Sequence, residues 1–207
     1  MTTVAVFKGF VIGAGMIIPI GAQNSYVLAQ GIKKNYHIIA ATICILCDFI
    51  LMSIGVYGGG AIITSNAILF NTMTWGGVLF LSVYGGLFFK SFLFPAKNQE
   101  SVIADLRSRK AVIATTLAVT LLNPHVYLDT VMIIGSISSQ YAAADKLSFL
   151  FGTALASLTW FYALSFSAAK LSKWLSKQRV QRIINLAISV IMWGIALSLI
   201  NSFNQIN

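Results

Sequence analysis

Residues 38–63 read IIAATICILCDFILMSIGVYGGGAII, an apolar stretch long enough to cross the hydrocarbon core of a bilayer as one helix. Asp48 is the single charged residue in this stretch. Five further apolar stretches lie at about 4–28, 67–89, 111–137, 147–169 and 183–203, so that six spans account for most of the 207 residues. We therefore expect an all-α membrane protein with six transmembrane helices.

The composition excludes a water-soluble domain. The chain is 57% hydrophobic and only 9% charged, whereas soluble domains contain roughly 25% charged residues. A net charge of +9 raises the question of nucleic acid, but the long apolar stretches leave no continuous basic face that could follow a phosphate backbone. The first residues lack the basic start of a secretory signal. We expect residues 1–207 to form a single integral membrane domain without a nucleic-acid partner.

The basic residues predict the orientation of the chain in the membrane. Twelve of the 14 lysines and arginines lie in or beside the loops between spans one and two, three and four, and five and six. The positive-inside rule places these loops in the cytoplasm and both termini outside, and it brings the basic residues close to lipid headgroups. A five-span arrangement, with a re-entrant first segment, would leave the same loops in the cytoplasm.

Two prolines interrupt apolar spans. Pro19 lies within the first span and Pro124 within the fourth, and each removes a helical hydrogen bond. Because each of these spans begins a set of three, the pattern predicts two inverted three-helix repeats, at about 1–94 and 111–207, joined by a cytoplasmic linker at 95–110. Broken helices at corresponding positions of two repeats indicate a central binding site in a transporter. The alternative is a pair of incidental kinks in packed helices.

Several motifs resemble those of the LysE family of basic amino-acid exporters, over nearly the whole chain. They are Pro-Ile-Gly-Ala-Gln-Asn at 19–24, Gln-Gly-Ile-Lys-Lys at 30–34, Cys-Asp at 47–48, Trp-Gly-Gly at 75–77, Asn-Pro-His-Val-Tyr-Leu-Asp-Thr at 123–130, Gln-Arg-Ile-Ile-Asn at 181–185 and Met-Trp at 192–193. The resemblance implies a multi-pass protein of the bacterial inner membrane that exports arginine, with lysine or related cations as further substrates. One departure is Ala22, where the family usually has a second proline.

Two of the five acidic residues, Asp48 and Asp129, lie inside spans. A carboxylate at the centre of a bilayer costs at least about 2.5 kcal/mol, so it normally has a partner or a function. Neither acid has a lysine or arginine at helical spacing, which suits a cationic substrate and a proton. We therefore expect Asp48 and Asp129 to bind substrate and to couple its export to protons by antiport. The alternative is that each is a protonated or hydrogen-bonded structural acid.

Arginine requires an anion for its guanidinium group and donors for its α-carboxylate. The two aspartates can accept the guanidinium fork in bidentate fashion, and the backbone N–H groups after each break can bind the carboxylate. Gly21 allows close approach at the first break. The further expected substrate-binding residues are Gln23, Asn24, Asn123 and Tyr127, although Tyr127 also suits an aromatic packing position in the core.

The sequence motifs that would indicate other functions are weaker. Cys44 and Cys47 form a C-x-x-C pattern, so a transmembrane thiol–disulfide carrier is an alternative, but reactive thiols need accessibility and a low pKa. His125 and Asp129 have the spacing of two metal ligands without a third. No nucleophile–base pair is present, so we expect neither an enzyme nor a cofactor. An exporter of another small molecule or of a metal ion, on the same scaffold, remains open, as does a homo-oligomer.

Overall fold

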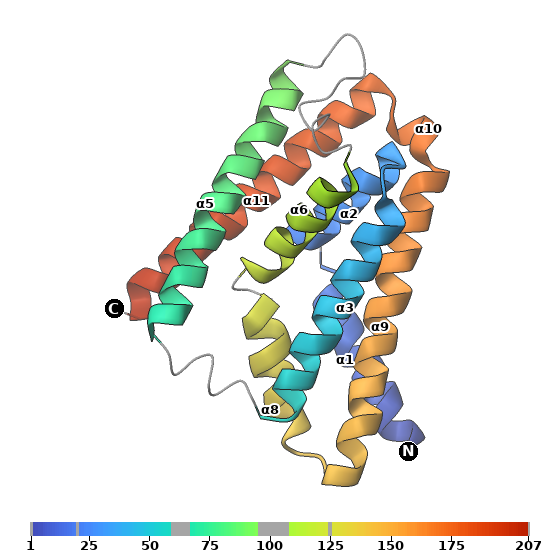
Figure 1. The fold of residues 1–207 in the computed structure, drawn as a ribbon, viewed down its shortest axis with the longest axis vertical. Helices are drawn as coiled ribbons and strands as arrows, with labels where there is room; N and C mark the ends of the chain where they lie inside the picture. Colours follow the sequence, from blue (N-terminus) through green and yellow to red (C-terminus); the bar gives the residue numbers. More distant parts are fainter. Residues whose placement is uncertain (1, 20, 59–66, 95–107, 124–125, 207) are drawn as a thin grey trace.

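The computed structural model describes residues 2–19, 21–58, 67–94, 108–123 and 126–206, and every regular element in these ranges is helical (Figure 1). The elements in chain order are α1 (Thr3–Ile17), α2 (Ala22–Lys33), α3 (His37–Val56), α5 (Ala67–Leu93), α6 (Arg109–Leu121), η2 (Tyr127–Ile133), α8 (Ile134–Ser138), α9 (Ala143–Lys170), α10 (Ser172–Leu175) and α11 (Gln178–Ile206). Segment η2 is a π-helix.

The helices have the length and composition of a membrane protein. Within the described ranges, α3, α9 and α11 are each long and apolar enough to cross a bilayer, and the pair α1 and α2 qualifies as a fourth, bent candidate. Helices α1 and α2 meet at an angle of 79°. The prediction of an all-α membrane protein is confirmed at this level.

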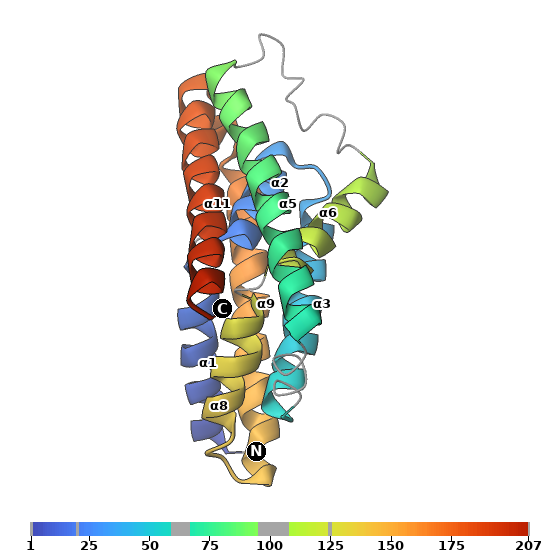
Figure 2. The ribbon, with the colours of Figure 1, turned by 90° about the vertical axis from the view of Figure 1, so that its left-hand side faces the viewer.

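Two of the apolar segments change direction or helix type near the middle of the molecule (Figures 1 and 2). Helix α1 runs from the end that carries the N-terminus to the middle, and α2 continues to the opposite end. Helix α6 enters from that opposite end, and η2 and α8 continue beyond the middle. Helices α3 and α9 pack against each other, with α1 on α9 and with α6, η2 and α8 on α3, while α5 and α11 form a separate long pair.

Glycines allow the closest of these helix contacts. A Cβ atom added at Gly55 would lie 2.6 Å from the carbonyl oxygen of Thr130, and one added at Gly135 would lie 2.8 Å from that of Gly55. Gly9 and Gly152 likewise face the backbone of the opposing helix where α1 crosses α9. Only a residue without a side chain permits such approach, and each of these contacts joins two helices of the same chain.

The basic helix ends gather at one end of the bundle. Helix α2 ends at Lys33, α6 begins at Arg109 and α9 ends at Lys170, and all three of these helix ends lie at the top of Figure 1. The N-terminus and the connection from α8 to α9 lie at the other end. The fold therefore separates charge along its long axis, as the loop composition predicts.

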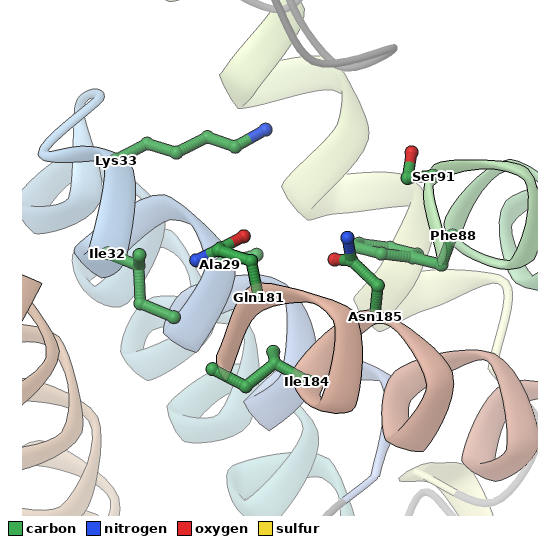
Figure 3. Close-up of a pocket in the computed structure, with 8 residues that line it drawn as sticks. All are labelled: Ala29, Ile32, Lys33, Phe88, Ser91, Gln181, Ile184 and Asn185. Carbon is green, nitrogen blue, oxygen red and sulfur yellow. The ribbon is translucent and has the colours of Figure 1, made fainter. Parts of the chain in front are cut away.

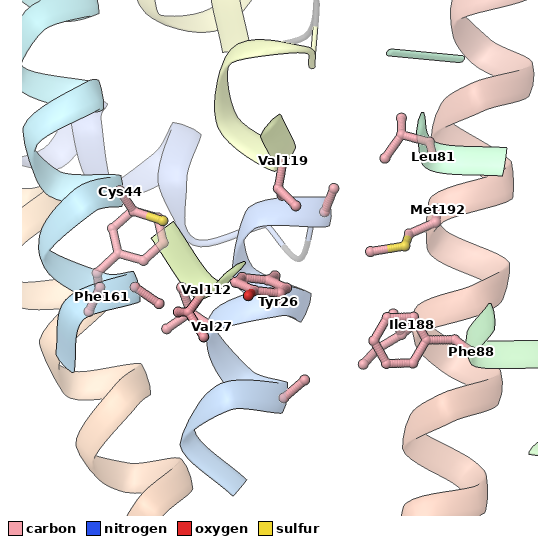
Figure 4. Close-up of a cluster of buried hydrophobic side chains, with 14 of the residues drawn as sticks. Tyr26, Val27, Cys44, Leu81, Phe88, Val112, Val119, Phe161, Ile188 and Met192 are labelled. Carbon is pink, nitrogen blue, oxygen red and sulfur yellow. The ribbon is translucent and has the colours of Figure 1, made fainter. Parts of the chain in front are cut away.

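The largest apolar core joins α2, α3, α6 and α9 to the α5–α11 pair (Figure 4). Tyr26, Val27 and Val112 contribute to it from one side, and Phe88 and Met192 from the other. Many large apolar side chains remain exposed on the outer faces, among them Leu79, Val83, Phe151, Ile183, Val190 and Leu197. A soluble protein rarely exposes so much apolar surface, whereas lipid tails cover it in a membrane.

Candidate functional site

Asp48 lies near the middle of α3, where only 2% of its surface is exposed. The Gln23 amide donates to its Oδ1 over 3.3 Å, and the Ser157 hydroxyl donates to its Oδ2 over 2.8 Å. Among the residues that the structure describes, no lysine, arginine or histidine forms an ion pair with this carboxyl group. The group is thus held by neutral donors from α2 and α9, without an internal positive charge.

The first break lies directly beside Asp48. Helix α1 ends at Ile17 and α2 begins at Ala22, with Pro19 between them. The Asn24 side chain spans this break: its Nδ2 donates to the carbonyl oxygens of Ile17 at 2.7 Å and of Pro19 at 2.8 Å. These are carbonyl groups that an uninterrupted helix would have satisfied. Asn24 therefore satisfies backbone groups that the break leaves free.

The N-terminus of α2 has the features of an anion-binding site. Gly21 is the N-cap residue, in an extended conformation with φ −108° and ψ −169°, and it has no side chain that could cap the first turn. Apart from its chain neighbours, no described residue has a heavy atom within 4 Å of the position that a Cβ atom on Gly21 would take. Backbone N–H groups at a helix N-terminus attract an anion, and Gly21 leaves room beside them. The expected role of Gly21 is compatible with this geometry.

A side chain also bridges the second break by binding a backbone carbonyl group. Helix α6 ends at Leu121 and η2 begins at Tyr127, whereas Pro124 and His125 lie outside the described residues. The Tyr127 hydroxyl donates to the carbonyl oxygen of Leu121 over 2.8 Å, from one side of the interruption to the other. Asn123 is buried here, with 6% of its surface exposed. At both breaks, a side chain of the following helix binds a carbonyl group of the preceding one.

Asp129 lies in the π-helical segment η2, while its side chain is outside the described part of the structure. A π-helical turn widens the backbone and occurs frequently at functional sites. The segment follows the second break and packs against α3, the helix that carries Asp48. The pairing of Asp48 with Asp129 in one site stays a prediction.

The C-x-x-C cysteines are inaccessible in this structure. Cys44 and Cys47 are free thiols with 1% and 7% of their surfaces exposed. The Cys44 sulfur lies 4.0 Å from the Thr120 hydroxyl of α6. Thiol–disulfide exchange needs an accessible thiolate, so this environment favours a packing role for both. Within the described ranges, no three histidine, cysteine, aspartate or glutamate side chains gather where a metal ion could bind.

Comparison with known proteins identifies the family. The model of the LysE type translocator family matches residues 14–202. The chain belongs to this family. YggA of Aeromonas salmonicida is 50% identical over 195 residues, 93% of each chain. Arginine exporter protein ArgO of Pectobacterium carotovorum subsp. carotovorum is 46% identical over 198 residues, covering 94% of this chain and 96% of the relative. ArgO of Salmonella typhimurium is 44% identical over 195 residues, covering 93% and 92%.

No solved structure matches the chain. The family match confirms the resemblance that the proline and aspartate motifs indicate. A LysE type translocator moves a solute across a membrane without converting it, so the chain is a transport protein and not an enzyme.

The structure adds two polar residues to the candidate site that the sequence does not indicate. Ser157 binds Asp48, and the Trp160 indole Nε1 donates to Asn24 Oδ1 over 3.1 Å. Both lie on α9, three residues apart and therefore on the same face of the helix. Serine is common in membrane helices, and interfacial tryptophan is expected near membrane surfaces, so neither residue marks a site by composition. Their spacing on one face is the only signal in the sequence.

Proposed function

We propose that this LysE type translocator exports L-arginine from the cytoplasm, with lysine and related cationic amino acids as further substrates, in exchange for protons. The observation that carries the proposal is Asp48, a buried carboxyl group without an ion-pair partner among the described residues, beside the first helix break. The relatives named arginine exporter protein, similar over nearly the whole chain, support arginine as the substrate.

The binding mode follows from the groups beside Asp48. A guanidinium group offers parallel N–H donors to both oxygens of a carboxylate, and these oxygens now accept from Gln23 and Ser157. Arginine would add charge-assisted hydrogen bonds to these oxygens, each of which can accept more than one donor, while Gln23 and Ser157 keep the carboxyl group oriented. The α-carboxylate would bind the N-terminus of α2, where Gly21 leaves space. We assign further contacts with the substrate to Asn24, Asn123 and Tyr127, and the role of the second acid to Asp129.

Proton exchange fits the energetics of export. Moving one positive charge outward against an inside-negative potential costs about 2.3 kcal/mol per 100 mV. A proton that moves inward as the arginine cation leaves cancels this charge movement, so that the pH gradient and the arginine gradient drive export. Asp48 or Asp129 would bind substrate and proton in turn.

The architecture that we propose has six spans in two inverted three-helix repeats, residues 1–94 and 111–207, with broken helices at Pro19 and Pro124. The helix pairs support it, because α1 packs on α9 as α6 packs on α3, and α5 packs on α11. We place the protein in the bacterial inner membrane with its basic loops in the cytoplasm and both termini outside. Lipid headgroups would contact those loops, and assembly into a homo-oligomer remains open.

Transport by purified protein in liposomes tests the proposal. Labelled arginine, lysine and a neutral amino acid are followed by counterflow, with and without a pH gradient. We expect arginine counterflow to exceed that of the neutral amino acid and the pH gradient to accelerate net export. Equal competition by the neutral amino acid would refute a cationic substrate, and indifference to pH would refute proton antiport.

The Asp48→Asn variant tests the residue that carries the proposal. The change keeps the size and most hydrogen-bonding capacity but removes the charge, so we expect arginine export to fall at least about a hundredfold, since paired buried charges contribute several kcal/mol. Asp145→Asn is the matched control, because Asp145 lies in the first turn of α9, where Thr2 donates to it. Wild-type export by Asp48→Asn would overturn the assignment.

A further inference from the structure

Four polar side chains of α2 form a stripe that runs from Asp48 toward the basic end of the molecule. Gln23, Tyr26, Gln30 and Lys33 are spaced by three, four and three residues, which places them on one face of the helix. We name these four residues the α2 stripe. At one end Gln23 donates to Asp48. At the other end Lys33 lines a pocket.

This pocket lies between α2, α5 and α11 (Figure 3). Its lining includes the polar side chains of Lys33, Ser91, Gln181 and Asn185. In Figure 3, the Lys33 side chain extends across the space toward α5, and the amide groups of Gln181 and Asn185 rise from α11 toward it. The pocket therefore offers a positive charge and neutral hydrogen-bonding groups at the end of the stripe.

The two middle members of the stripe are buried, and their hydrogen bonding is incomplete. Tyr26 is 1% exposed and Gln30 is fully buried. The Gln30 Nε2 has no hydrogen-bond partner among the described residues, and the Tyr26 hydroxyl faces the Thr115 and Thr116 hydroxyls without a well-formed hydrogen bond. Gln30 Oε1, by contrast, accepts from Asn35. Buried polar groups are nearly always satisfied, so each exception requires an explanation. Gln30 and Tyr26 lie on the stripe between a pocket and a buried acid, where a ligand would meet them, and in this they differ from three buried serine hydroxyls that share the feature, those of Ser25, Ser148 and Ser189.

Helix α6 lies opposite the stripe and also presents hydroxyl groups. Thr115, Thr116 and Thr120 are buried on α6, and the Tyr26 hydroxyl lies near the first two of them. Tyr84 of α5 donates to the Thr115 hydroxyl over 3.3 Å. Apolar neighbours, among them Val112 and Val119, close the space around Tyr26 in the present arrangement (Figure 4). Polar groups from α2, α5 and α6 thus gather around Tyr26.

We propose that the α2 stripe lines the access path along which a cationic amino acid moves from the pocket to Asp48. This inference rests on the proposed function and assigns to Tyr26 and Gln30 direct contacts with the moving substrate. The chemistry matches, because a tyrosine ring attracts a guanidinium group over its face, and the Tyr26 hydroxyl and the Gln30 amide offer hydrogen bonds. Lys33 at the pocket attracts the α-carboxylate and repels the guanidinium group, which orients the substrate with its carboxylate at Lys33 and its side chain toward Asp48.

Thiol labelling tests the path separately from the transported solute. In a Cys44→Ser, Cys47→Ser background, Tyr26→Cys and Gln30→Cys are treated with a membrane-impermeant cationic methanethiosulfonate, in inside-out and right-side-out vesicles. Val190→Cys is the control, because Val190 lies on α11 between Ile188 and Met192 of the core but is 59% exposed toward lipid. We expect labelling of both stripe positions from the cytoplasmic side to be about tenfold faster than that of the control, and excess arginine to slow it.

The outcomes separate the two proposals. If both stripe positions are labelled but the wild type transports no arginine, the assignment of arginine as substrate is refuted and the access path is supported. Arginine export with no labelling at either stripe position, or with equal labelling of Val190→Cys, would overturn the path. Tyr26→Phe gives a second measurement with little effect on folding, since it removes only a hydroxyl group that lacks a well-formed hydrogen bond. We expect its arginine export to fall about fivefold, whereas an unchanged rate contradicts contact with the substrate.

Discussion

At the scale of single residues, Asp48 is distinguished by its hydrogen-bond partners. Its hydrogen bonds come from an amide and a hydroxyl group rather than from a lysine or arginine. Neutral donors orient a carboxyl group without satisfying its charge, which leaves the charge for a ligand. A structural buried acid normally pairs with a cation or coordinates a metal, so this environment favours a binding role.

Ser157→Ala tests whether orientation matters. Ser157 donates the shorter hydrogen bond to Asp48, 2.8 Å long, and hydrogen bonds to charged groups contribute about 1.5–3 kcal/mol. We expect arginine transport at low substrate concentration to fall about tenfold, measured as kcat/KM in liposomes. Ser53→Ala is the control, because Ser53 on α3 donates to the Phe49 carbonyl oxygen of its own helix. Equal rates for the two variants would refute the positioning role.

Asn24 has a different role at the same scale. It donates to two carbonyl groups at the first break and accepts from Trp160. Asn24→Ala leaves these partners unsatisfied, and we expect a lower melting temperature in detergent. A double-mutant cycle with Trp160→Phe should show a coupling free energy of about 0.6–1.7 kcal/mol, the range for polar pairs in membrane proteins. Additive effects would show that the Asn24–Trp160 contact does not stabilise the break.

At the scale of elements, the fold depends on close packing of helices as much as on apolar composition. Lipid tails are as apolar as leucine, so helices in a membrane associate through shape and close backbone approach. Gly9 on α1 faces the carbonyl group of Phe149 on α9, whereas Gly15 on the same helix faces open space.

Alanine substitutions at Gly9 and Gly15 form a matched pair. We expect Gly9→Ala to destabilise the protein by about 1–3 kcal/mol, because the added methyl group meets backbone atoms that cannot move aside cheaply. Gly15→Ala should be neutral or slightly stabilising, since alanine is the better helix former by about 1 kcal/mol. Thermal unfolding in detergent measures both. The same loss of stability in both variants would show that α1 is sensitive throughout and not specifically at its contact with α9.

At the scale of the whole molecule, the separation of charge predicts how the protein inserts. The basic ends of α2, α6 and α9 lie together, opposite the N-terminus. Reporter fusions test the orientation: we expect alkaline phosphatase to be active when fused after Asn207 and inactive when fused within 172–177, because only the outside permits its folding. An active fusion in the basic loop would reverse the orientation. An N-terminal reporter distinguishes six spans from five, since five spans place that terminus inside.

The sequence by itself determined the class of the protein and its unusual residues. Each membrane span must satisfy its own backbone hydrogen bonds, so the local sequence is enough to predict a helix. Basic loops, interrupting prolines and isolated acids are likewise visible in the local sequence. The motifs also sufficed for the family. Among the expected site residues, Gln23 meets Asp48 in the structure, whereas the Asp129 side chain and Pro124 lie outside its described residues.

Only the tertiary structure decided which side chains meet. Ser157 reaches Asp48 from 109 residues away in the chain, and Trp160 reaches Asn24 from 136. Such contacts depend on how helices cross and on which face each one turns inward, and any apolar helix can present several faces to its neighbours. The α2 stripe is the clearest case. The spacing of its residues is present in the sequence, but its proposed role depends on the buried acid at one end and the pocket at the other.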